Sequence, residues 1–172
     1  MLTQAIVLHL LGRVWICTCG TVRLWVGDMH SSELSQQVLD WYTPSHVIHG
    51  FLLFGATWLL WRRRPPGPRL IAAVLIEALW EIVENSPYVI DRYRHATMAL
   101  GYTGDSVLNS VSDIGAMILG FAIARRLLAW ATLVVAVVPE LLTLAVIRDN
   151  LTLNVLMLVA PSDAVRAWQA GG

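Results

Sequence analysis

Apolar residues in this chain gather into long runs that polar residues interrupt at few places. Four runs approach the ~20 residues that a helix needs to cross ~30 Å of hydrocarbon. The second and third reach that length when polar residues at one end are included. The runs are residues 45–61, 70–83, 107–124 and 127–147. The pattern therefore predicts an all-α, multi-pass membrane helix bundle with four transmembrane helices.

Two shorter apolar segments lie near the ends of the chain. The first ends at Leu11, before Gly12 and Arg13, which is short for a span. It predicts a tilted or interfacial helix, unless the given start omits upstream residues. A cleaved signal peptide is disfavoured because a basic leading region and a small-residue cleavage site are missing. The second segment, residues 151–160, is too short to cross and predicts a short re-entrant or interfacial helix.

Composition supports a membrane environment. Of the 172 residues, 56% are hydrophobic and 14% are charged, whereas about a quarter of the residues in soluble proteins are charged. The mean hydropathy is +0.61. A formal net charge of zero gives no sign of a nucleic-acid partner, so the expected partner is the lipid bilayer. No repeat or long linker divides residues 1–172, which are expected to form a single integral membrane domain.

Arginines predict the orientation of the bundle. The connection RRRPPGPR (62–69) and the pair Arg125 and Arg126 lie at ends of spans that face the same side. The positive-inside rule assigns that side to the cytoplasm. Arginines also occur on the opposite side, so the bias is not complete. The loops expected there are residues 27–44, 85–104 and 148–150.

Polar residues in the predicted spans recur at helical spacing, so each set shares one helix face. Because successive spans alternate in direction, all the sets are expected in the outer half of the membrane. A carboxylate facing lipid would cost about 2.5–3.5 kcal/mol on insertion scales, so the sets are expected to converge inside the bundle. The sets are His46 and His49; Glu77, Glu81 and Glu84; and Asp105, Asn109 and Asp113.

Converging carboxylates repel one another, so a positive partner is expected among them. Imidazole and carboxylate together suit a divalent metal such as zinc, iron or manganese, and helical bundles build such sites. The spacing is not the Glu-x-x-His of di-iron bundles. Two alternatives remain open, namely a polar network paired with arginines and a proton or ion path. The candidate metal ligands are His46, His49, Glu81, Glu84, Asp105 and Asp113.

Cys17 and Cys19 form a second constellation in the stretch ICTCG. A C-x-C pair can chelate a soft metal such as copper or zinc. It can instead form a redox-active disulfide in an oxidising outer compartment. The pair is a candidate second metal or redox site, and a metal shared with His46 and His49 is a further alternative. A pair of small residues near the membrane interface, without a chemical role, is an equal alternative.

Two classes of function follow from these residues. The first is an intramembrane metal-dependent enzyme that acts on a lipid-linked or phosphate-bearing substrate, with water activated by the ion. In this hypothesis Glu77 is the candidate catalytic base, and Arg92 and Arg148 bind the anionic group of the substrate. The alternative is a non-enzymatic membrane factor, whether transporter-like, a proton relay or a scaffold, whose polar network sets helix packing.

Several long strings resemble a known bacterial family. They are CTCGTVRLW, SQQVLDWYTPSHVIHGF, EALWEIVENSPYVIDRYR, GDSVLNSVSDIGAMILGF and IRDNLTLNVLML. From Gly12 to Gln169 the chain resembles uncharacterised protein family 0314, also called domain of unknown function 2585. The resemblance implies a multi-pass protein of the bacterial inner membrane, and the orientation above puts its polar cluster toward the periplasm. It implies no reaction. The family pattern has a longer apolar lead before GR-x-x-x-C-x-C than this chain.

Overall fold

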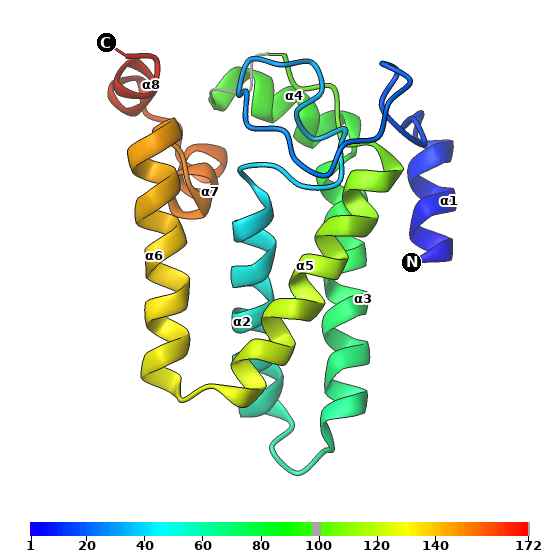
Figure 1. Ribbon diagram of the computed structural model, residues 1–172, viewed down its shortest axis with the longest axis vertical. Helices are drawn as coiled ribbons and strands as arrows, with labels where there is room; N and C mark the ends of the chain where they lie inside the picture. The colour runs from blue at the N-terminus through cyan, green and yellow to red at the C-terminus, as the bar shows by residue number, and fades with distance from the viewer. Residues whose placement is uncertain (98–100, 172) are drawn as a thin grey trace.

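The chain folds into helices that gather around one central bundle (Figure 1). The computed structural model describes residues 1–97 and 101–171, and within them the only strand-like pairing is an isolated bridge between Trp25 and Leu39. The all-α class predicted from the sequence is confirmed. The helices are α1 (Leu2–Leu10), α2 (Thr43–Leu60), α3 (Pro66–Glu84), α4 (Pro87–Ala96), α5 (Val107–Arg126), α6 (Ala129–Ile147), α7 (Leu151–Val159) and α8 (Asp163–Gln169).

Local chemistry explains where several helices begin. The N-cap side chains of α4, α5 and α7 each accept a hydrogen bond from a backbone N–H of the first turn, as Ser, Asn and Asp commonly do. These caps are Ser86, Ser106 and Asn150. Proline occupies the first turn of α2, α3 and α4, where its missing N–H costs nothing.

Helices α2, α3 and α5 pack together, and α2 lies closest to α5. Gly50 on α2 and Gly120 on α5 face each other so closely that a Cβ on Gly50 would lie 2.8 Å from the Gly120 Cα. Small residues at a crossing let two backbones approach in this way. Ile114, Met117 and Phe121 form the apolar core beside this crossing. The crossing fixes the two helices that carry the predicted histidine and aspartate sets.

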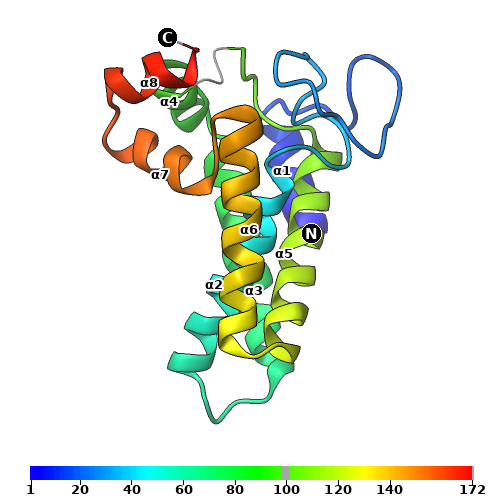
Figure 2. The ribbon, with the colours of Figure 1, turned by 60° about the vertical axis from the view of Figure 1, so that its left-hand side comes forward.

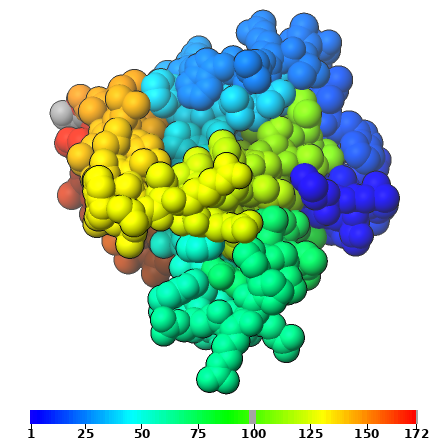
Figure 3. Space-filling view, turned by 60° about the horizontal axis from the view of Figure 1, so that its bottom comes forward, coloured from blue at the N-terminus to red at the C-terminus, as the bar shows by residue number. Residues whose placement is uncertain are grey.

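The two ends of the bundle differ in character. The α2–α3 connection, which contains Arg62 to Arg64, and the α5–α6 connection lie at the same end. Figure 3 looks at that end and shows the α2–α3 connection projecting from the surface. Helices α4, α7 and α8 lie at the opposite end, together with the long segment between α1 and α2 (Figures 1 and 2). The polar loops that the sequence predicted on one side, residues 27–44, 85–104 and 148–150, therefore gather at one end in their described parts; residues 98–100 lie outside the described residues.

Within the described residues, α5 and α6 are long and apolar enough to cross a membrane. Two such helices are a weak indication of a membrane location, and the predicted number of four transmembrane helices is not confirmed. The reason is compositional, because α2 carries two histidines and α3 carries Arg69 and three glutamates. The membrane placement of the nine-residue helices α1 and α7 remains a prediction.

Two short helices were not predicted. Helix α4 lies within residues 85–104, which the sequence analysis treated as a loop, and α8 follows α7. Ser86 followed by Pro87 is the usual start of a helix and was the available signal for α4. Both helices lie at the end of the bundle that holds the polar residues (Figure 2).

Glu140 connects α6 to α7. Its two carboxylate oxygens accept hydrogen bonds from the backbone N–H groups of Leu151 and Thr152, at 2.9 and 3.1 Å, and Oε2 also accepts the Thr152 hydroxyl at 2.7 Å. We expect Glu140→Ala to lower the stability of the folded protein by about 1–3 kcal/mol, because it leaves the first turn of α7 without these acceptors.

Thermal unfolding of the detergent-purified protein, followed by circular dichroism, measures this loss. Thr152→Ala is the matched comparison, because it removes only one of the three bonds and is expected to have the smaller effect. A melting temperature unchanged in Glu140→Ala would contradict the assignment.

Candidate functional site

The two histidines of α2 are held by one carboxylate of α3. The Nδ1 atoms of His46 and His49 both lie 2.9 Å from Glu77 Oε1. A carboxylate accepts hydrogen bonds only, so this geometry favours the tautomers with hydrogen on Nδ1. The Nε2 atom of each ring then keeps its lone pair for another partner. A histidine that binds a metal usually has its other nitrogen held in this way.

Glu81 and Asp113 lie within ion-pair distance of His46, but three of their four carboxylate oxygens lack a hydrogen-bond partner. His46 Nδ1 is 3.6 Å from Glu81 Oε1, and His46 Nε2 is 3.8 Å from Asp113 Oδ2. Glu81 is 0% exposed and Asp113 4%. Both Glu81 oxygens and Asp113 Oδ1 are buried without a hydrogen-bond partner. A buried carboxylate without partners costs several kcal/mol, so this trio has the geometry and the unmet bonding capacity of a cation site.

Glu84 and Asp105 form a second group around Glu81, with ligand atoms within 4.8 Å of one another. These two carboxylates already have partners. The Tyr93 hydroxyl donates to Glu84 at 2.6 Å. Asp105 accepts from the Tyr102 hydroxyl at 2.8 Å and from its other neighbour, the Asn85 amide, at 2.7 Å. Burial, followed by the nearby charge of Glu84, raises the pKa of Asp105 to about 7.

A cavity of about 950 Å³ opens beside the cluster. Its lining includes polar side chains such as His46, His49 and Asp113 and apolar side chains of α7 such as Leu151 and Val155. A volume of this size accommodates a small-molecule ligand. A lining that offers both kinds of side chain suits a molecule with one polar and one hydrophobic part.

The arginines predicted to bind substrate lie elsewhere. Arg92 Nε donates to the Leu158 carbonyl at 2.9 Å, and Arg148 Nη1 donates to the Trp168 carbonyl at 2.9 Å. Neither lines the large cavity, and Arg148 lines a smaller one instead. Among the described residues, Arg166 is the one arginine that lines the large cavity. Its position could not be predicted from the sequence, because Arg166 lies on the short helix α8, outside the periodic apolar runs.

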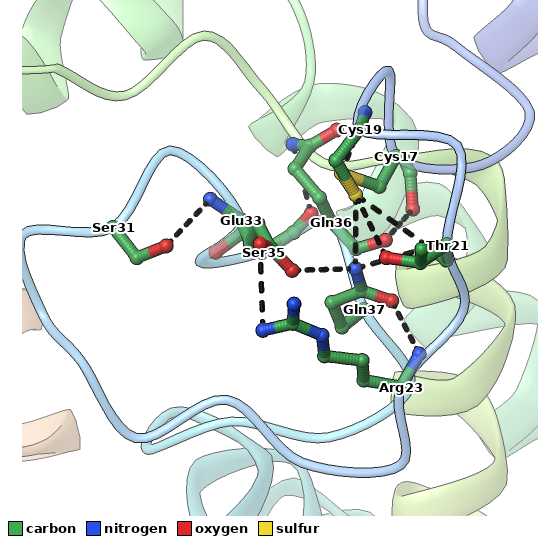
Figure 4. The surroundings of a disulfide bond; sticks show 10 residues. Cys17, Cys19, Thr21, Arg23, Ser31, Glu33, Ser35, Gln36 and Gln37 are labelled. Atoms are coloured by element: carbon green, nitrogen blue, oxygen red, sulfur yellow. Dashed lines mark hydrogen bonds and ion pairs between the residues drawn. A yellow bond between two sulfur atoms is a disulfide. The ribbon is translucent and has the colours of Figure 1, made fainter.

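The two cysteines form a disulfide away from the histidines. Figure 4 shows the Cys17–Cys19 bond with Thr21, Gln37 and Glu33 around it. Within the described residues, the sulfurs group with Glu33 as a candidate site and share no ligand group with His46 or His49. The alternative of one metal shared between the cysteines and the histidines stays a prediction, and this grouping of side chains does not favour it.

Comparison with known proteins places the chain in a family. The profile of the family described as "Protein of unknown function (DUF2585)" matches residues 8–171. The chain belongs to the DUF2585 family. The resemblance predicted from the sequence strings is thereby confirmed.

Relatives of this DUF2585 protein carry the family name UPF0314 protein. One from Rhizobium meliloti is 59% identical over 168 residues, which cover 98% of this chain and 85% of the relative. One from Sinorhizobium fredii is 58% identical with the same coverage. One from Paracoccus denitrificans is 58% identical over 160 residues, covering 93% of this chain and 83% of the relative. No solved structure matches the chain.

In this DUF2585 protein the predicted polar sets meet at one place. The His46 ring of α2 lies within 4 Å of Glu77 and Glu81 of α3 at its Nδ1 atom, and its Nε2 atom lies 3.8 Å from Asp113 of α5. The structure adds Tyr93 and Tyr102, which hold Glu84 and Asp105. Aromatic residues outside the apolar runs gave no sequence signal for this role.

Proposed function

We propose that this DUF2585 protein is a multi-pass protein of the bacterial inner membrane in which α2, α3, α5 and α6 cross the bilayer. Each has 18 to 20 residues, which at ~1.5 Å per residue gives ~27–30 Å, close to the hydrocarbon thickness. The arginine-rich connections share one end, which we assign to the cytoplasm by the positive-inside rule. The polar cluster and the cavity then lie on the periplasmic side.

The cluster is a binding site for a divalent metal ion. His46, Glu81 and Asp113 are the ligands, and Glu84 and Asp105 lie close enough to Glu81 to complete the coordination or to bind a second ion. One observation carries this proposal: Glu81 is fully buried, and both of its oxygens lack partners beside a histidine. Imidazole and carboxylate ligands suit zinc, iron or manganese.

Glu77 acts as a positioning residue for the two histidines. Its Oε1 already accepts a hydrogen bond from each ring, and Glu77 does not line the cavity among the described residues. His49 lines the cavity, and its Nε2 is the nitrogen left for proton transfer to a bound molecule. His49 therefore replaces Glu77 as the candidate acid or base.

The protein is an enzyme that acts on an amphiphilic, phosphate-bearing substrate such as a lipid. The apolar side chains of α7 bind the hydrophobic part, and Arg166 at the cavity binds the anionic part. A divalent ion in the site would supply a Lewis acid and an activated water. His46, Asp113 and His49 all line the cavity, so a metal ion held by His46 and Asp113 and the acid or base His49 would act on the same bound molecule.

The test uses the full-length protein in detergent, loaded in turn with zinc, manganese and iron(II). It is incubated with phospholipid vesicles of defined composition, and mass spectrometry follows the products. We expect turnover that Asp113→Asn abolishes, a loss on the order of 10²-fold or more. The control Asp91→Asn changes an exposed carboxylate of α4, 70% exposed, and is expected to retain activity.

Turnover that persists in Asp113→Asn, or that no metal affects, would contradict the proposal. A folded protein that binds no metal would favour the non-enzymatic alternative, in which the histidines and Glu77 form a proton-conducting or structural network.

A further inference from the structure

The Cys17–Cys19 disulfide differs from a structural crosslink in its position and surroundings. A disulfide stabilises a fold mainly by closing a loop in the unfolded chain, and the effect grows with the length of the loop. Two residues of separation make this loop one of the shortest possible. Stabilisation of the fold therefore explains little of its presence.

The two sulfurs are unequal in access. Cys17 is 4% exposed, whereas Cys19 is exposed. The segment before them is fixed, because the N–H groups of Val107 and Leu108 donate to the Val14 and Trp15 carbonyls. An incoming thiolate can therefore reach Cys19 and not Cys17.

Cys17 Sγ, the buried sulfur, is placed to act as the leaving group. The backbone N–H of Cys19 donates to Cys17 Sγ at 3.1 Å, and a hydrogen bond of this kind stabilises a thiolate. The negative charge of the neighbouring Glu33 carboxylate would destabilise this thiolate, but its own partners offset that charge. It accepts from Gln37 Nε2 at 2.9 Å and pairs with Arg23 at 3.5 Å. Figure 4 shows Gln37 beside the sulfurs and Arg23 on the far side of Glu33 and Gln37.

We propose that Cys17 and Cys19 form a thiol–disulfide exchange site that oxidises a protein dithiol on the outer face of the membrane. The site does not depend on a metal in the histidine cluster. It rests only on the orientation proposed above, because an oxidising compartment is where such a disulfide persists.

The exchange has two steps. A thiolate of the partner attacks Cys19 Sγ, the Cys17–Cys19 bond breaks, and Cys17 leaves as a thiolate, which gives a mixed disulfide between Cys19 and the partner. The second thiolate of the partner then attacks its own sulfur in that bond and releases Cys19 as a thiolate. The partner loses two electrons and forms a disulfide. Cys17 and Cys19 gain these electrons and take up two protons as thiols.

The first test measures which sulfur reacts. Cys17→Ser leaves the thiol of Cys19 free, and Cys19→Ser leaves that of Cys17, each in the full-length protein in detergent. With oxidised glutathione as the probe, we expect Cys17→Ser to form the mixed disulfide on the order of 10-fold faster or more. Equal rates, or a faster reaction in Cys19→Ser, would overturn the proposal. Circular dichroism of both variants keeps the comparison to folded protein.

The second test uses the unchanged protein. Dithiothreitol, a small dithiol, is expected to reduce the bond while the helical circular dichroism signal stays constant, and maleimide labelling counts the two thiols released. Reduction that occurs only together with unfolding would overturn the proposal. So would purified protein that carries two free thiols and one bound zinc or copper ion at this place. The metal content of the histidine cluster is expected to be the same in the oxidised and reduced proteins, so failure here is distinct from failure of the proposed enzyme.

Discussion

Replacing Glu81 by glutamine is expected to weaken the binding of a divalent metal at the proposed site of this protein. The wild type should retain about one ion per chain or more, and Glu81→Gln should weaken the affinity on the order of 100-fold or more, because it removes a ligand from a site of three. Glu77→Gln should cost less, about 10- to 100-fold, since Glu77 holds the histidines without being a ligand. Inductively coupled plasma mass spectrometry, on samples dialysed against buffers of defined free metal concentration, measures the metal bound by both variants.

The same variant distinguishes a metal site from a structural network through the melting temperature of the metal-free protein, which the two models change in opposite directions. In metal-free protein, Glu81→Gln removes a buried carboxylate without partners, so it is expected to raise the melting temperature. If Glu81 instead belongs to a polar network that holds the helices together, Glu81→Gln is expected to lower the melting temperature. Glu33→Gln is the control for metal content, because Glu33 belongs to the disulfide region. Metal retained in Glu81→Gln would contradict the assignment.

Gly120→Ala is expected to disrupt the contact between α2 and α5. The added Cβ would lie 2.9 Å from the carbonyl carbon of Val47 and 3.1 Å from its Cα, and backbone atoms cannot move aside as a side chain can. Overpacking of a core usually costs 1–3 kcal/mol, so about 3 kcal/mol or more is expected when the obstacle is a helix backbone. The helices that carry His46 and Asp113 would separate, so metal affinity should fall together with stability.

Gly115→Ala is the matched control on the same helix. A Cβ at Gly115 would meet nothing within 4 Å, and alanine favours a helix by about 1 kcal/mol over glycine. This variant should therefore be slightly more stable than the wild type. Thermal unfolding in detergent measures both variants side by side. Equal melting temperatures for Gly120→Ala and Gly115→Ala would show that the α2–α5 contact is not built as described.

The helical class and the meeting of the polar sets could be predicted because both follow from spacing. Glu77 and Glu81 recur at the helical period in an apolar segment, and the cost of exposing them to lipid fixes the direction in which they point. Because successive spans run in opposite directions, the same reasoning places His46 and Asp113 at the same depth in the bundle. No knowledge of the loops was required.

Positions that depend on loops could not be predicted. Arg92 and Arg148 were expected to face the substrate, yet they donate to the carbonyls of Leu158 and Trp168. Arg166 lines the cavity, and α8, which carries it, lies beside α4 at that end of the bundle (Figure 2). Residues outside the periodic spans have no lipid-facing penalty to orient them, so their spacing carries no such information. Glu77 was expected to be a catalytic base, and its hydrogen bonds to His46 and His49 could not be predicted, because spacing along one helix does not show which side chains of another helix a carboxylate contacts.

X-ray absorption spectroscopy of metal-loaded, full-length protein is the most direct measurement of the central claim. We expect a first shell of nitrogen and oxygen ligands at about 2.0–2.2 Å for zinc, with the outer-atom scattering of imidazole and without sulfur. Loss of that signal in His46→Ala would assign the imidazole. A shell containing sulfur at about 2.3 Å would move the metal to the cysteines. That result, or folded protein that takes up no metal, would contradict the account.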